Sequence, residues 1–445
     1  MAQFFKASRT NKQNNKIIKN CQVDKLDHQG RGLLFHQNKP MFVDGALAGE
    51  VLDVSITEDK KRYKKAKIIK IQQQSELRIE PSCEHFQECG GCQLQHIDQD
   101  VQIDVKQKGL VSLFERFAKY KPSELSPTLK GNEWQYRRCA RFAVMFNKKT
   151  KKVEMGFRQA GSNELIKQRV CLVLKPALAE LILPLKALLN QLQGKADLGH
   201  IELVEAEQGV AVLLRHLKPL SKADIQEILD FSVTHKLHFY AQSTPTNIQC
   251  LTDVDKLTYS LPAQGCQFEF NIDDFLQINA NINEKMVAQA IQWLGLTSTD
   301  RVLDLFCGLG NFTLPIAKQA QQVVGVEGVQ KMVDRASENA QRCQLNNVRF
   351  YQADLSDLNA LKSDWAKQTY DKVLLDPARA GAAECMEFVI NKKPSHIVYV
   401  SCDPVTLARD SQLLLDKSYQ LDKLGLIDMF PQTAHMESMA LFVKK

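Results

Sequence analysis

The feature that most constrains the fold is a regular alternation of strand-like and helix-like segments from about Phe275 to the end of the chain. The strand-like runs are RVLDLF, QVVGVE, VRFYQAD, YDKVLLD and HIVYVS, and the helix-like runs are FTLPIAKQA, KMVDRASENAQRC, GAAECMEFVI and PVTLARDSQLLLDK. Strands that alternate with helices at this spacing predict a doubly wound, parallel α/β sheet. Because 445 residues are too many for one hydrophobic core, further domains are expected ahead of this sheet.

The earlier part of the chain has a different pattern. Residues 1–15 form a polar tail, and residues 16–75 contain five short strand-like runs separated by glycines. Glycines at tight corners are typical of a small OB-like β-barrel. Residues 76–270 mix strands and helices with a cysteine-rich segment, which predicts a central α+β domain, and residues 271–445 form the α/β domain. We therefore expect a multidomain α/β protein with a β-barrel at its N-terminus.

Positive charge is concentrated in the predicted barrel. Residues 1–80 contain 16 Lys and Arg but nine Asp and Glu, whereas the rest of the chain has 42 of each kind. A basic turn, EDKKRYKK, also surrounds Tyr63. An ordinary solvated face is one interpretation, but basic side chains around an aromatic ring suit phosphates and a stacked base. The distribution of charge therefore favours a nucleic-acid partner.

The chain carries no recognisable targeting or membrane segment. The first 20 residues lack an apolar core, and the most apolar stretch, ALAELILPLKALL, is interrupted by Glu180, Pro184 and Lys186. We expect a cytoplasmic protein that does not enter a membrane. In a reducing compartment, its 12 cysteines are candidates for metal ligands, a nucleophile or core packing rather than for disulfides.

Polar groups follow the first three strands of the predicted α/β sheet. The turn in VLDLFCGLGNF contains Gly308 and Gly310, which let the backbone approach a ligand closely. Glu327 ends the next strand, where a carboxylate can accept both ribose hydroxyls, and Asp354 ends the third strand. A strand–helix turn with a capping acid is the alternative. The three strand ends together predict an adenosine-type ligand, and the lack of a GK[ST] loop argues against a triphosphate.

A cysteine and two carboxylates are expected at the same rim. Cys402 ends the strand in IVYVSCDPVT, Asp376 ends the strand in LLDPARAG, and Glu437 falls in a predicted loop within FPQTAHMESM. A strand cysteine is commonly core filler. However, the carboxyl ends of parallel strands are where such sheets bind ligands.

These motifs resemble those of a known family, the bacterial RNA uracil carbon-5 methyltransferases that use S-adenosylmethionine. The matching pieces cover most of residues 270–445, and they are DDFLQIN, VLDLFCGLGNFTLP, VVGVEGV, LLDPARAG, IVYVSCDPVTLARD and MFPQTAHMES. The barrel resembles the TRAM domain of the members that act on large-subunit ribosomal RNA. The resemblance implies methylation of a specific uridine in 23S ribosomal RNA, and we expect the chain to act as a monomer.

The resemblance also implies roles for individual residues. Cys402 would be the nucleophile and Glu437 the general base. Attack of a thiolate on carbon-6 of uracil puts electron density on carbon-5, whose hydrogen a base must later remove, so one thiol and one carboxylate are the minimum set. The helix after Pro404 is expected to favour the thiolate. The implied cofactor contacts are Gln277, Phe306, Asn311, Glu327, Asp354 and Asp376.

The sequence departs from the family at two positions. Asp354 stands where asparagine is expected in some relatives. The strand-end motif usually reads Ser-Cys-Asn-Pro, whereas this chain has Asp403 after the cysteine. This change places an additional carboxyl group beside the thiol.

The cysteine-rich segment CEHFQECGGC predicts a metal site. Cys83, Cys89 and Cys92 are three thiols within ten residues of a glycine-containing loop, and a fourth ligand must come from elsewhere. The residues alone leave Cys139 and Cys171 as candidates. The resemblance selects Cys171 and makes the metal a [4Fe–4S] cluster, with a structural or RNA-orienting role because methyl transfer needs no electrons.

Other functions compete with this interpretation. A cytosine carbon-5 methyltransferase also needs a thiol, but the proline–cysteine pattern of those families is absent here. Methylation of another 23S uridine or of transfer RNA is a second alternative. A non-catalytic iron–sulfur RNA-binding protein is a third, against which the intact Cys402 and Glu437 argue.

Overall fold

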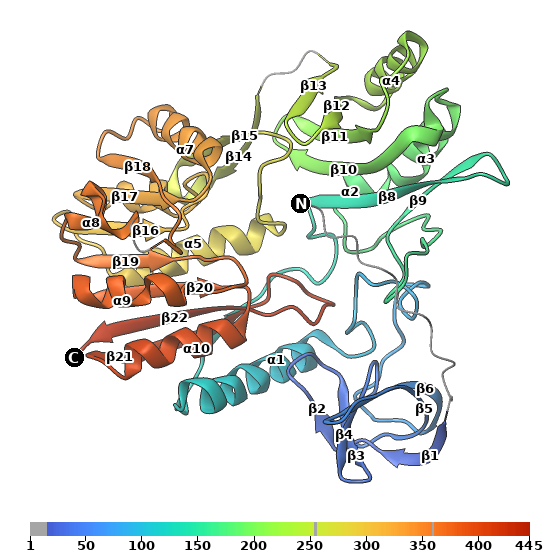
Figure 1. Cartoon of the computed structure of the whole chain (residues 1–445), viewed down its shortest axis with the longest axis horizontal. Helices are drawn as coiled ribbons and strands as arrows, with labels where there is room; N and C mark the ends of the chain where they lie inside the picture. Colours follow the sequence, from blue (N-terminus) through green and yellow to red (C-terminus); the bar gives the residue numbers. More distant parts are fainter. Residues whose placement is uncertain (1–15, 253–255, 358–359) are drawn as a thin grey trace.

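The computed structural model describes residues 16–252, 256–357 and 360–445, which form three large β-sheets (Figure 1). The predicted polar tail of residues 1–15 lies outside the described residues. Within the described ranges, no helix is both long enough and apolar enough to cross a membrane.

The N-terminal sheet has six strands in the order β1-β5-β6-β4-β3-β2. The five predicted strands are present, and β2 is a short addition. Only Val23 and Asp24 separate the two edge strands β1 and β2, and their backbone amides donate to Glu50 and Leu33 at 2.9 and 3.0 Å. The two edges of the sheet are therefore brought together around one small core. The strands are β1 (Ile17–Gln22), β2 (Lys25–Leu26), β3 (Gly32–His36), β4 (Lys39–Val43), β5 (Val51–Asp59) and β6 (Lys64–Gln73).

The central sheet also has six strands, in the order β13-β12-β11-β10-β8-β9. Helix α3 (Ile182–Gln191) packs on it through a buried leucine-rich face, and α4 (Lys222–His235) begins with a capping box formed by Ser221 and Asp224. The hairpin of β14 (Leu257–Leu261) and β15 (Cys266–Phe270) leads out of this region. The remaining elements are β8 (Cys139–Asn147), β9 (Lys152–Gly156), α2 (Pro176–Ala179), β10 (Leu198–Ala206), β11 (Gly209–His216), β12 (Leu237–Thr244) and β13 (Asn247–Cys250).

The C-terminal sheet confirms the predicted α/β architecture and extends it. Its order is β18-β17-β16-β19-β20-β22-β21-β7, and the first five strands are parallel. Strand β22 then pairs antiparallel with both β20 and β21, an arrangement that the helix–strand alternation did not predict. The strands are β7 (Ser126–Leu129), β16 (Arg301–Leu305), β17 (Gln322–Glu327), β18 (Val348–Gln352), β19 (Lys372–Leu375), β20 (His396–Ser401), β21 (Tyr419–Ile427) and β22 (Glu437–Lys444).

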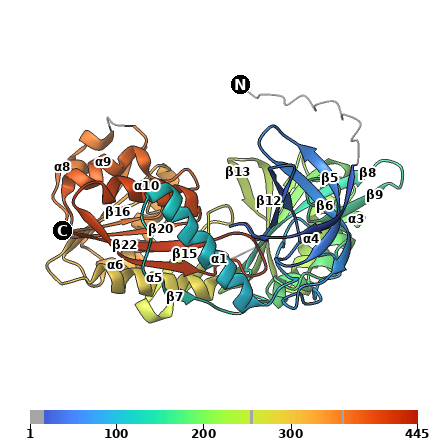
Figure 2. The same ribbon diagram turned by 90° about the horizontal axis from the view of Figure 1, so that it is seen from below.

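Alternating side chains of the central strands enter two cores, one on each face of this sheet. In β20, Val398 and Val400 belong to one core, and Ile397 and Tyr399 belong to the other. Figure 2 shows helices on both faces. One face is covered by α5 (Ala280–Leu294), α6 (Thr313–Ala317) and α7 (Gln330–Arg342), and the other by α1 (Gln99–Leu113), α8 (Asp364–Lys367), α9 (Ala383–Lys392) and α10 (Pro404–Leu415).

The segment that contains α1 and β7 differs from the predicted domain organisation. It precedes the central sheet in the chain, yet it packs on the C-terminal sheet. Strand β7 pairs in parallel with β21, and Lys106 of α1 forms a buried ion pair with Asp428 at 2.8 Å. Because this segment completes the edge of the last sheet, the central region is inserted between two parts of one α/β unit.

The N-terminal sheet docks on α1 through the turn between β2 and β3. A Cβ atom on Gly109 of α1 would lie 3.1 Å from the Cα atom of His28, so glycine permits this close packing. In the same turn, Gly30 has a φ of +72° and packs against Leu94. The N-terminal sheet is therefore in direct contact with a helix of the α/β unit.

Candidate active site

The topology of the C-terminal sheet brings Cys402 and Glu437 together. The last residue pair between β20 and the antiparallel β22 is Ser401 with Ser438. Cys402 follows Ser401 and Glu437 precedes Ser438, so these two residues lie next to each other just beyond that pair. Glu437 also pairs with Ile427 of β21. The predicted loop position of Glu437 is therefore wrong, because the apolar run that follows it forms a central strand of the sheet.

Burial determines the protonation of this site. Glu437 is only 3% exposed, and burial together with the nearby Asp376 raises its pKa to about 8. Burial raises the pKa of Asp376 to about 7. Burial, assisted by the charges of Glu437 and Asp376, raises the pKa of Cys402 to about 11. In the free protein at neutral pH, Cys402 is therefore a protonated thiol.

The expectation that the helix after Pro404 favours the thiolate is not met in this state. The carboxylate of Asp403 caps α10 and accepts the backbone amides of Val405 and Thr406 at 2.9 and 3.3 Å. The side chain of Asp403 thus caps the N-terminus of this helix. Burial and the charges of Glu437 and Asp376 raise the pKa of the Cys402 thiol rather than lower it.

The sequence reasoning missed Arg379, which does favour the thiolate. This exposed side chain follows β19 and is the cation that lowers the pKa of Cys402, although burial and the two carboxylates outweigh it. Arg379 could have been found from the sequence, because it lies three residues after Asp376 in the motif LLDPARAG.

Three of the predicted cofactor residues line one cavity. Phe306, Glu327 and Asp354 surround a volume of about 290 Å³ at the carboxyl ends of β16, β17 and β18. Glu327 accepts the backbone amides of Gly308 and Val329 at 3.1 and 3.0 Å, so it also holds the glycine-containing turn. Phe306 has a φ of +65°, a conformation that is rare for a non-glycine residue and is characteristic of functional turns.

The other three predicted cofactor residues lie outside the lining of this cavity. Asn311 forms a reciprocal amide pair with Asn283, with hydrogen bonds of 2.9 and 3.0 Å. The backbone oxygen of Gln277 accepts the Nε atom of Arg138 at 2.8 Å. Asp376 lies at the end of β19 and interacts electrostatically with Cys402 and Glu437. The cavity and the thiol–carboxylate site therefore lie at the same rim of the sheet.

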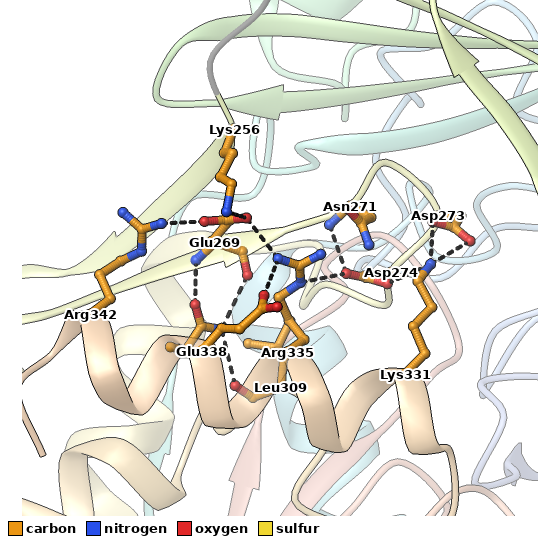
Figure 3. Close-up of polar contacts among 11 residues, drawn as sticks. Lys256, Glu269, Asn271, Asp273, Asp274, Leu309, Lys331, Arg335, Glu338 and Arg342 are labelled. Carbon is orange, nitrogen blue, oxygen red and sulfur yellow. Dashed lines mark hydrogen bonds and ion pairs between the residues drawn. The ribbon is translucent and has the colours of Figure 1, made fainter. Parts of the chain in front are cut away.

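A network of ion pairs anchors the segment that leads to Gln277 (Figure 3). Glu269, which is 3% exposed, accepts hydrogen bonds from Arg335 at 2.7 Å and from Arg342, and both arginines belong to α7. Asp274 forms an ion pair with Lys331 at 3.3 Å. The segment between the β14–β15 hairpin and α5 is thus fixed on the helix that follows β17.

The four predicted cysteine ligands line a second cavity, of about 760 Å³. Its lining includes Cys83, Cys89, Cys92 and Cys171, whereas the alternative candidate Cys139 is not part of the lining. The Cys89 sulfur accepts the backbone amide of Gly91 at 3.4 Å. Among the described residues, no group of three or more His, Cys, Asp or Glu side chains is arranged to hold a single metal ion.

Comparison with known protein families identifies the class to which this fold and this site belong. The family model described as tRNA (Uracil-5-)-methyltransferase matches residues 98–445. The chain therefore belongs to this family.

The chain is also similar to particular proteins along its whole length. It is 61% identical to the 23S rRNA (uracil(1939)-C(5))-methyltransferase RlmD of Psychromonas ingrahamii, over 99% of this chain and 100% of that protein. It is 47% identical to the protein of the same name from Aeromonas hydrophila, over 100% of both chains.

A solved structure shows the same fold. The tRNA (uracil-54, C5)-methyltransferase of Pyrococcus abyssi, determined with S-adenosyl-L-homocysteine, superposes with a TM-score of 0.74. The alignment covers 96% of this chain and 99% of that chain at 23% identity.

Proposed function

We propose that this protein methylates carbon-5 of uracil-1939 in 23S ribosomal RNA with S-adenosylmethionine as the methyl donor. The position of the uridine is supported by the full-length similarity to proteins named for that reaction. The observation that carries the chemistry is the juxtaposition of Cys402 and Glu437 at the rim of a uracil-5-methyltransferase sheet.

In this proposal, Cys402 and Glu437 act in sequence. S-adenosylmethionine supplies an electrophilic methyl group when bound. The Cys402 sulfur loses its proton and bonds to carbon-6 of uracil, which makes carbon-5 nucleophilic enough to take that methyl group. The carboxylate of Glu437 then accepts the proton from carbon-5. The electron pair of that C–H bond restores the double bond between carbon-5 and carbon-6, and the Cys402 sulfur leaves carbon-6 as a thiolate. The target uracil must first leave the stack of RNA bases to reach the buried rim of the sheet.

We assign the remaining residues to binding. Phe306, Glu327 and Asp354 would surround the adenosine part of the cofactor, and Gln277, Asn311 and Asp376 would complete its site. Residues 16–75 would serve as an OB-like TRAM barrel that contacts RNA phosphates. Residues 76–270, apart from α1 and β7, would form the cysteine-containing domain, and residues 271–445 together with α1 and β7 would form a Rossmann-like methyltransferase domain. The protein would act as a cytoplasmic monomer.

The cysteine site fits a polynuclear cluster. A single zinc ion lies about 2.3 Å from each sulfur ligand, so it requires its thiolates to be in close contact with one another. The four thiols share a cavity without forming such a group, and a [4Fe–4S] cluster spreads its ligands over four irons. Cys83, Cys89, Cys92 and Cys171 would hold this cluster, whose role would be structural.

Replacing Cys89 with alanine should remove the cluster. Protein purified without oxygen should be brown with about four irons per chain, whereas Cys89→Ala should lose both the colour and the iron. Cys139→Ala is the matched control, since Cys139 lies outside the cavity lining and its loss should leave the iron content unchanged. Iron and acid-labile sulfide analysis measures the result. Stoichiometric zinc without labile sulfide would contradict the assignment.

The function is tested by mapping 5-methyluridine in cells that lack the gene. Mass analysis of 23S ribosomal RNA should show unmodified uracil at position 1939, and a plasmid with the wild-type gene should restore the methyl group. A plasmid with Cys402→Ala should not restore it. Persistent methylation at this position in the deletion strain, or loss of methylation in transfer RNA instead, would redirect the proposal to another substrate.

A further inference from the structure

The loop between β21 and β22, residues 428–436, leads directly into Glu437, and we call it the base loop. Gln432 lies at its centre, is 2% exposed and has a φ of +67°. Residues other than glycine rarely adopt this backbone conformation, so the surrounding structure must stabilise it.

Gln432 is held by residues that follow the cysteine-rich segment, namely Gln93, Leu94 and Gln102, rather than by β21 and β22. Its backbone oxygen accepts the amides of Gln93 and Leu94 at 2.9 and 3.0 Å. Its backbone amide donates to Oε1 of Gln102 at 3.0 Å, and Nε2 of Gln102 donates to Oε1 of Gln432 at 2.9 Å. Gln102 of α1 is completely buried, so water does not compete for these bonds.

Neighbouring contacts hold the part of the base loop that precedes Gln432 to the same region of the chain. The hydroxyl of Tyr136 donates to the backbone oxygen of Pro431 at 2.9 Å. The buried ion pair of Lys106 with Asp428 fixes the start of the loop. The loop is therefore positioned by residues that lie about 300 positions earlier in the sequence.

The cysteine-rich segment of residues 83–92, which we call the cysteine loop, ends directly before the residues that hold Gln432, because Cys92 immediately precedes Gln93. We infer that Gln102, Gln432 and the backbone of residues 93–94 form a clamp through which the cysteine loop positions Glu437. Gln102 and Gln432 are positioning residues, since they act on the base through the loop. The inference rests on the proposed role of Glu437 as the base, and it gives the cysteine site a function in catalysis that involves no electron transfer.

The first experiment measures the loop directly. Hydrogen exchange of the full-length, anaerobically purified protein should become about tenfold faster in residues 428–437 of Gln102→Met, because this change leaves buried polar groups of Gln432 without partners. Gln107→Met is the matched control. Gln107 lies on the same helix but donates to Thr128, so its replacement should leave exchange in the base loop unchanged.

The second measurement distinguishes positioning of the base from a purely structural role. In Gln102→Met, kcat should fall by about tenfold or more, within the roughly 10²- to 10⁴-fold contribution of a general base. The KM for S-adenosylmethionine and the iron content should stay at wild-type values. Gln102→Glu keeps the oxygen that accepts the Gln432 amide and should recover part of the lost kcat. A methylated covalent RNA adduct should accumulate, since the base step is the one slowed.

A third experiment changes the cysteine loop and measures the effect on the base loop. Cys92→Ser should also accelerate exchange in residues 428–437, in the absence of RNA and S-adenosylmethionine, whereas the exposed Cys250→Ser should not. Protection in the central strands β10 and β11 serves as the reference for intact folding.

Two results would overturn the inference. Unchanged exchange in the base loop of Gln102→Met or of Cys92→Ser would show that the clamp does not hold the loop. Faster exchange with full kcat would show that the clamp does not position the base. A wild-type protein that forms no 5-methyluridine would instead refute the proposed function, and the exchange measurements would remain a separate test of the clamp.

Discussion

Cys402→Ala should form no detectable 5-methyluridine, with a loss of activity of about 10⁴-fold or more, the scale seen when a covalent nucleophile is removed. Without the sulfur, no bond to carbon-6 can form and carbon-5 remains a poor nucleophile. Binding of RNA and of S-adenosylmethionine should persist, because the cavity at Phe306, Glu327 and Asp354 does not include this side chain. Methyl transfer from labelled cofactor and equilibrium binding measure the two properties separately.

The control for this substitution removes a thiol elsewhere. Cys250 is exposed and lies on β13 of the central sheet, so Cys250→Ala should retain full activity. Substantial methylation by Cys402→Ala would mean that the reaction proceeds without this covalent bond, and it would remove the main chemical argument for the assignment of the site.

Glu437→Gln should trap the reaction after methyl transfer. The glutamine side chain is nearly the same size but cannot accept the proton from carbon-5, so the sulfur cannot leave carbon-6. A methylated RNA–protein adduct should therefore survive denaturing gel electrophoresis. It should be absent from the Cys402→Ala, Glu437→Gln double variant. Glu387→Gln, on the exposed side of α9, is the matched control and should turn over normally.

The pH dependence of the wild-type enzyme should report the same two groups. Because burial raises the pKa of Glu437 to about 8 and that of Cys402 to about 11, both groups are mainly protonated at pH 7. Each must lose a proton for turnover, so the rate should rise steeply with pH below about 8. Above that value only the thiol still limits the reaction, and the slope should decrease. Normal turnover by Glu437→Gln, or a rate that is flat between these pKa values, would contradict the assignment.

Much of the fold could be predicted from local sequence signals. The alternation of β-branched runs with amphipathic stretches predicted the parallel strands β16 to β20, because side-chain periodicity directly reflects which face of an element is buried. The glycines around the N-terminal strands and the spacing of Cys83, Cys89 and Cys92 are equally local. So is the position of Cys402 at the end of a strand.

The arrangement of the catalytic rim was decided only by tertiary structure. The run after Glu437 is long and apolar, but no local pattern states that it pairs antiparallel with β20 and so places Glu437 beside Cys402. Likewise, α1 and β7 complete the C-terminal sheet although the central region separates them from it in sequence. Strand and helix preferences act over a few residues, whereas pairing between distant segments depends on which surfaces the whole chain can bury together.

The protonation state of Cys402 also depends on the tertiary structure. The sequence by itself determined which titratable groups stand at the strand ends, and the helix after Pro404 suggested a thiol of lowered pKa. The folded chain instead buries Cys402 near the carboxyl groups of Glu437 and Asp376, so the pKa of the thiol rises. The type of each reactive group is a property of its residue, but its pKa depends on the desolvation and charges that surround it after folding.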